Sequence, residues 1–333
     1  MEPTAHSSVA RRFLRFADAE NLALDTLLDP TLAAAFEEGC ASERVPATAI
    51  VEALQVCAER SGRPDLGAAF GAFGEVGGYG PLSLMPEHCT TIRQIVEVGV
   101  QFMHLENSGI ALEIDEGEEE ASVCYLPMVA TRWGSAQFME AILMLSLKGA
   151  RAFLGEQWAP LRVEFGHAAP SNLRAHRRLF RANLKFGAER YAMVFSSRDL
   201  DRPAKAGDPE RRAALEMRLV ELDRASSQDF SDQVERATAR VLSRGSVRIG
   251  AVAESLGMQP RTLQRRLADD GMQFSQVLER VRRRTALDYL LNAHRPTLTD
   301  LAQRLSYGDA SATSRFLRGS FGLGVRGFPG DEI

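Results

Sequence analysis

The sequence predicts two domains, an α+β N-terminal domain and an all-α C-terminal domain with two helix-turn-helix motifs. First, 333 residues are long for one compact domain. Second, the apolar pattern mixes strand and helix periods early in the chain and becomes helical towards its end. Third, the charge changes sign along the chain. From Gln228 onwards there are 16 arginines and 12 acidic residues, a surplus of four positive charges, whereas the whole chain carries −4. Such a division indicates two tasks in one chain.

The expected boundaries follow from polar, turn-rich stretches that flank residues 211–222. We expect an N-terminal domain over residues 13–223 and a linker over residues 224–232. A C-terminal domain that carries the two helix-turn-helix motifs is expected over residues 233–328.

The N-terminal domain is predicted from alternating helix and strand patterns. Thr91 is expected to cap a helix, and residues 110–114 and 121–125 alternate around an acidic turn, as in a β-hairpin. The acidic residues 115–120 are interpreted as a solvated hairpin tip rather than a metal site. Further along, we expect helices over residues 135–154 and 171–180 and strands over residues 161–167 and 191–196.

The first helix-turn-helix is predicted between Val247 and Leu267. Ile249, Val252, Ala253 and Leu256 fit a short amphipathic helix, and Gly257 provides a turn before Pro260 begins a second helix. The outward face of that second helix would carry Arg261, Gln264 and Arg265. Arginine can bind guanine with two hydrogen bonds and glutamine can bind adenine, so this face suits the major groove.

The pattern then recurs in altered form. Residues 298–305 predict a short helix, residues 306–309 a turn and residues 310–320 another helix. A helix over residues 274–292 would connect the two units. Its 19 residues span about 28 Å, close to the ~34 Å between successive turns of the major groove.

Residues 246–328 resemble the AraC/XylS family of transcription regulators. The residues that carry the resemblance include the segment PRTLQRRL at 260–267, Leu301-Ala302, Tyr307 and Ser311. The resemblance implies DNA contacts by Arg261, Thr262, Gln264 and Arg265 in the first unit and by Ala310, Ser311, Ser314 and Arg315 in the second. Two positions depart from the family pattern, which usually has Gly at Ser306 and Phe at Thr313. They predict a looser second unit.

Residues 13–209 are similar to the arabinose-binding type of N-terminal effector domain found in one AraC subfamily. The matching segments are residues 78–102, 161–180 and 183–203. The name of this domain type does not show that the effector is a sugar, so the effector and its binding residues stay unknown.

Several other classes of protein are not favoured. The sequence has no G-x-S-x-G, no glycine-rich phosphate loop and no H-E-x-x-H, so we expect no enzyme and no cofactor. Its four dispersed cysteines predict reduced thiols, and His88, His104, His167 and His176 lack metal-ligand spacing, so no metal is expected. The absence of a long apolar run and of an export signal predicts a cytoplasmic protein.

The sequence therefore predicts a bacterial, effector-controlled transcription regulator that binds promoter or operator DNA. RNA polymerase and a second copy of the chain are its expected partners. Activation is the first expectation, although the sequence leaves the sign of regulation open. Two alternatives remain: a constitutive regulator whose N-terminal domain only dimerises, and an enzyme fused to a DNA-binding domain.

Overall fold

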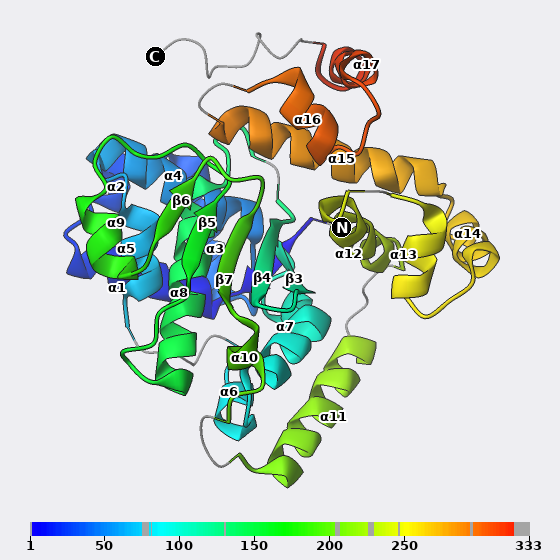
Figure 1. Cartoon of the computed structure of the whole chain (residues 1–333). Helices are drawn as coiled ribbons and strands as arrows, with labels where there is room; N and C mark the ends of the chain where they lie inside the picture. Colours follow the sequence, from blue (N-terminus) through cyan, green and yellow to red (C-terminus); the bar gives the residue numbers. More distant parts are fainter. Residues whose placement is uncertain are drawn as a thin grey trace. The chain divides into compact units, whose positions relative to one another are not determined.

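The structure, a computed structural model, describes residues 2–74, 80, 82–129, 131–203, 207–225, 230–245, 247–293 and 296–322. The chain forms two compact units, Glu2–Ser226 and Ser227–Ile333 (Figure 1). The predicted linker overlaps the end of helix α11 (Pro209–Ala225) and the start of helix α12 (Phe230–Ser243). Its positions 226–229, and the predicted domain end at 323–328, lie outside the described residues.

The N-terminal unit begins with a group of helices that the sequence analysis did not predict. They are α1 (Ser8–Ala19), α2 (Leu24–Leu27), α3 (Pro30–Ala41), α4 (Ala47–Ser61) and α5 (Leu66–Ala72), with β1 (Thr4–His6) paired to β2 (Arg44–Pro46). The ring of Phe13 lies 5.4 Å from that of Phe36 and 5.6 Å from that of Phe70. These buried contacts hold α1, α3 and α5 together, since aromatic rings bury large apolar areas.

A five-stranded sheet follows, in the order β3-β4-β7-β5-β6. Its strands are β3 (Ile110–Glu116), β4 (Glu120–Pro127), β5 (Arg162–Phe165), β6 (Leu184–Phe186) and β7 (Tyr191–Ser196). The predicted hairpin is confirmed as β3 and β4, and the predicted strands after it as β5 and β7. Strand β6, which pairs in parallel with β5, was not predicted. The mixed α and β character of this domain is thereby confirmed.

The acidic residues around the hairpin turn are exposed, and several of them form ion pairs. Arg93 contacts both Glu116 and Asp201, at 2.8 and 2.7 Å. Arg190 lies 3.1 Å from Asp115, and Arg162 lies 2.8 Å from Glu120. All three acids of the hairpin are exposed, as expected for a solvated hairpin tip, and their ion pairs also tie the hairpin to neighbouring elements.

Helices cover the sheet and complete the unit. They are α6 (Met85–His88), α7 (Ile92–Glu106), α8 (Ala136–Leu154), α9 (Arg174–Phe180) and α10 (Ser197–Leu200), besides α11. Helix α8 packs on β4, β5 and β7 and, on its other side, on α4 and α5, whereas α7 packs on β3 (Figure 1). As predicted, the Thr91 side chain caps α7 by accepting a hydrogen bond from the Gln94 amide.

Glu140, a buried carboxylate on α8, joins three elements. The Nε2 atom of His167, which follows β5, lies 3.0 Å from its Oε1, and Nε2 of His176 on α9 lies 3.0 Å from both carboxylate oxygens. Glu140 and His176 are fully buried. Although burial acts to raise the pKa of Glu140, the hydrogen bonds from the two histidines lower it overall.

The C-terminal unit is helical throughout its described part. It contains α12, α13 (Ile249–Ser255), α14 (Pro260–Asp269), α15 (Phe274–Asn292), α16 (Leu298–Arg304) and α17 (Ala310–Phe321). One apolar cluster joins α12, α13, α14 and the start of α15, and a second joins the end of α15 to α16 and α17. In the described parts of both units, no helix is both long enough and apolar enough to cross a membrane.

Candidate nucleic-acid interface

Helices α13 and α14 form a tight pair. Gly257, in the turn between them, has φ +64°, a left-handed conformation that glycine adopts without steric cost. Pro260 then occupies the first turn of α14, where its missing N–H is not needed. The sequence predicted this arrangement from the same two residues.

Helix α14 has one buried and one exposed face. Leu263 and Leu267 are fully buried and belong to the same apolar cluster as Val252 and Ala253 of α13. On the other face Arg261, Gln264 and Arg265 are exposed, and Thr262 is half-buried. Residues three and four apart share a helix face, so the leucines that anchor α14 also fix the direction in which these polar side chains point.

The arginines of this unit fall into two groups. Some hold the unit together: Arg266 lies 3.9 Å from the Phe230 ring, and Arg284 pairs with Glu235. By contrast, Arg261, Arg265 and Arg315 make no hydrogen bond or ion pair with another described residue. Their guanidinium groups are therefore available to an external partner.

Helices α16 and α17 repeat the arrangement with different turn chemistry. Ser306 has φ +56°, so it occupies the left-handed conformation that Gly257 has in the first pair. The Asp309 side chain caps α17 by accepting from the Ala312 amide. Thr313 and Leu317 are fully buried and hold α17 against its neighbours.

The contact residues predicted on α17 lie on its outer side. Ala310, Ser311 and Arg315 are exposed, whereas Ser314 is half-buried. Ser314 accepts a hydrogen bond of 2.9 Å from Arg318, an exposed residue that the prediction omitted. The spacing could have revealed it, because Arg318 follows Arg315 by three residues and therefore shares its face.

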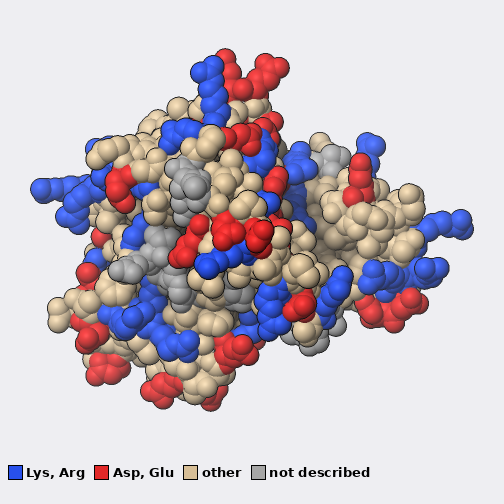
Figure 2. All heavy atoms as spheres, turned by 90° about the horizontal axis from the view of Figure 1, so that it is seen from below, with Lys and Arg blue, Asp and Glu red and all other residues tan. Residues whose placement is uncertain are grey.

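Helix α15 connects the two pairs. Its 19 residues match the predicted range and span about 28 Å. Near its middle, Arg282 donates hydrogen bonds to the carbonyl oxygens of Leu305 and Ser306 and lies 4.0 Å from the Tyr307 ring. This contact fixes the second turn against the connecting helix. In Figure 2, Lys and Arg side chains lie at the right of the view, the side on which α14 lies in Figure 1, with acidic side chains beside them.

Comparisons with known proteins identify two matching family models. Residues 18–204 match the arabinose-binding N-terminal domain of AraC transcription regulators. Residues 252–328 match a helix-turn-helix domain. Together the two models cover both units in the order that the sequence predicted.

Relatives are similar over most of the chain. The HTH-type transcriptional regulator VirS of Mycobacterium tuberculosis is 27% identical over 83% of this chain and 82% of its own length. The ornithine utilization regulator of Pseudomonas aeruginosa is 26% identical over 77% of this chain and 76% of its own. The crystal structure of the transcriptional regulator CdpR from Pseudomonas aeruginosa, 18% identical, aligns over 96% of both chains with a TM-score of 0.47.

Proposed function

Since this chain belongs to the family of AraC transcription regulators with an arabinose-binding N-terminal domain, we propose that it is an effector-controlled regulator that binds specific promoter DNA. The observation that carries the proposal is the exposed face of α14. There Arg261 and Arg265 have no partner in the described part of the chain, and Gln264 lies beside them. These side chains can read base edges in the major groove, with Thr262 at the edge of the contact.

We propose that α16 and α17 form a second helix-turn-helix, which contacts DNA through Ala310, Ser311, Ser314 and Arg315. Its support is the repeated geometry: a short helix, a turn residue with positive φ at Ser306, and a helix anchored by buried residues. The length of α15 suits two contacts in successive turns of the major groove. Arg318 is added as a contact to phosphate, because it is exposed on the same face.

The finer parts of the proposal concern the partners. The N-terminal domain would sense an effector and pair with a second copy of the chain, and the bound regulator would act on RNA polymerase. Family membership supports these three expectations. A constitutive regulator would not need the apolar cavity described below, and the comparisons give no support to a fused enzyme.

The test begins by selecting a binding site for the full-length protein from a pool of random duplexes. Affinity and base preference are then measured for Gln264→Ala and Arg265→Ala. Each variant should lose about 1–3 kcal/mol of specific binding and relax the preference at one or two base pairs.

Arg266→Ala is the matched control, since Arg266 follows Arg265 directly but contacts the Phe230 ring. We expect it to lower the stability of the unit while its folded fraction keeps the base preference. Unchanged affinity and preference in both Gln264→Ala and Arg265→Ala would disprove the assignment of α14.

A further inference from the structure

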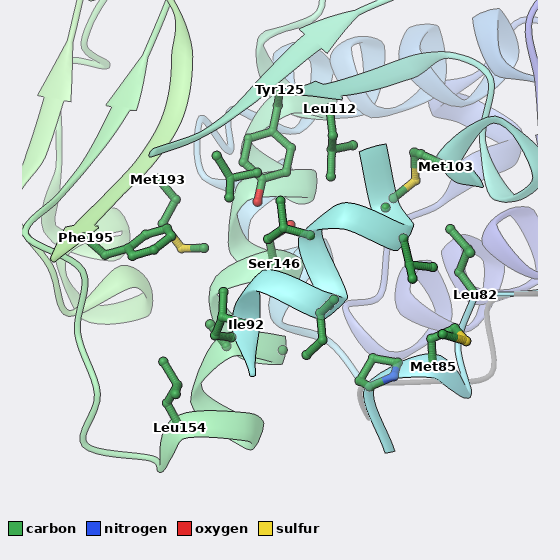
Figure 3. A pocket seen from close by; sticks show the side chains of 18 of the residues that line it. Leu82, Met85, Ile92, Met103, Leu112, Tyr125, Ser146, Leu154, Met193 and Phe195 are labelled. Carbon is green, nitrogen blue, oxygen red and sulfur yellow. The ribbon is translucent and has the colours of Figure 1, made fainter. Parts of the chain in front are cut away.

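The N-terminal domain encloses a cavity of about 220 Å³ between helices α6, α7 and α8 and strands β3, β4 and β7 (Figure 3). Its wall consists mainly of aliphatic side chains, together with three methionines and the rings of Phe195 and Trp158. Small residues make room for it, with Gly99 on α7 and Ala150 on α8 at its wall. Methionine side chains are flexible and polarisable, so such a wall can adapt to ligands of different shape.

The polar groups in this wall are few. In Figure 3 the Tyr125 hydroxyl points toward Ser146. The Trp158 indole Nε1 donates to Asp199 at 2.9 Å. No charged side chain lines this cavity in the described part of the chain. A sugar or an amino acid inside it would lose more hydrogen bonds to water than these few groups could replace, which is costly.

We propose that this cavity binds an effector whose buried part is an uncharged, apolar body of about ten non-hydrogen atoms, such as a medium-length alkyl chain or a fused aromatic ring. The size follows from comparison with benzene, because a dry apolar cavity of about 150 Å³ admits its six carbon atoms and the cavity described here is larger. The inference deepens the proposed effector control and rests on it. An apolar effector would differ in its chemistry from arabinose, the sugar after which this type of domain is named.

The protein contains a natural reporter for the test. Of its two tryptophans, Trp158 lines the cavity, whereas Trp133 lies outside the lining and next to Arg132. Full-length Trp133→Phe therefore carries one tryptophan, at the cavity. It is titrated with 1-decanol and naphthalene as apolar probes and with L-arabinose and L-ornithine as polar ones. We expect a saturable change of Trp158 emission at one molecule per chain for an apolar probe and none for the polar probes.

Two alanines on α8 provide a matched pair of variants. Ala150 is buried at the cavity wall, whereas Ala152 is exposed two residues later. In the Trp133→Phe background, Ala150→Leu should fill the cavity and weaken binding at least about tenfold, and Ala152→Leu should not change it. Ala150→Met, with a more flexible side chain, replaces Ala150→Leu if that variant fails to fold.

Two readouts separate this inference from the proposed function. Affinity for the selected DNA site is measured with and without the apolar probe. Saturable binding of an apolar probe that Ala150→Leu weakens supports the cavity assignment. If the bound probe leaves the DNA affinity unchanged, the cavity assignment stands and the proposal of effector control by this cavity is wrong. If neither apolar probe binds, or if L-arabinose or L-ornithine binds and is blocked by Ala150→Leu, the inference is overturned, while specific DNA binding can still stand.

Discussion

At the scale of single residues, Ser306 occupies a backbone conformation that favours glycine. Its φ is +56°, and the equivalent turn of the first helix pair has Gly257 at +64°. A side chain in this conformation costs about 1 kcal/mol or more. The Ser306 hydroxyl donates to the Gly245 carbonyl oxygen.

We therefore expect Ser306→Gly to stabilise the C-terminal unit by up to about 1 kcal/mol, measured by urea denaturation. Gly257→Ala is the matched control. Apart from its chain neighbours, no described residue has an atom within 4 Å of the added Cβ, so its expected loss of stability would be purely conformational. Destabilisation by both substitutions would show that the contact with Gly245 outweighs the strain at Ser306.

A second residue-scale prediction concerns Glu106, at the end of α7. Its Oε2 accepts from the Leu82 amide, and its buried Oε1 has no hydrogen-bond partner among the described residues. Burial raises the pKa of this carboxyl from 4.5 to about 7, although the Leu82 hydrogen bond and the nearby Arg44 oppose the shift. Between these pH values the group is protonated when folded and ionised when unfolded, so stability should fall as the pH rises, by up to about 3 kcal/mol.

Glu106→Gln should remove that loss, because an amide does not ionise. Urea denaturation near about pH 5 and about pH 8 measures the difference, and the variant should be the more stable protein at the higher pH. Glu97→Gln, an exposed position on the same helix, serves as the control. An equal pH slope in wild type and Glu106→Gln would refute the assignment.

At the scale of elements, the buried group of Glu140, His167 and His176 holds α8, α9 and the end of β5 together. Glu140→Leu removes the acceptor of two buried ring N–H groups and should cost about 3 kcal/mol or more. Since the pKa of Glu140 is lowered in the folded protein, its contribution is present above the ordinary value of 4.5 and is lost as the pH falls through the lower folded value.

The measurement is denaturation of wild type, Glu140→Leu and Glu140→Gln at neutral and acidic pH. In Glu140→Gln, the part of the acid-induced loss of stability that comes from protonation of this carboxyl should be absent. Glu156→Leu, an exposed position just after α8, should be nearly neutral. If Glu140→Leu is as stable as wild type, this group does not hold the elements together.

The same elements show what could be predicted from the sequence. Local signals predicted the cap at Thr91, the β3–β4 hairpin, the length of α15 and the turn at Gly257, because each depends on residues close together in the chain. The grouping of Glu140 with His167 and His176, and the cavity beside Ala150, depend on residues far apart in the chain. No periodicity reveals such long-range contacts, and for that reason the sequence suggested neither.

At the scale of the whole molecule, the net charge changes from negative to positive near the boundary between the two units, and each unit has apolar clusters of its own. A fragment from Arg224 to Ile333 contains both helix pairs and both C-terminal clusters, so we expect it to fold and to bind the selected DNA site without the N-terminal domain. Its affinity should fall steeply with salt concentration, since each phosphate contact releases counterions.

Removing one arginine that contacts phosphate should reduce the slope of log affinity against log salt by about one. Arg318→Ala is expected to do so with the base preference kept, whereas Arg265→Ala should change the preference. Circular dichroism first establishes that the fragment is folded. If the folded fragment then binds no DNA while the full-length protein does, recognition requires both units, and the assignment of DNA binding to the C-terminal unit alone fails.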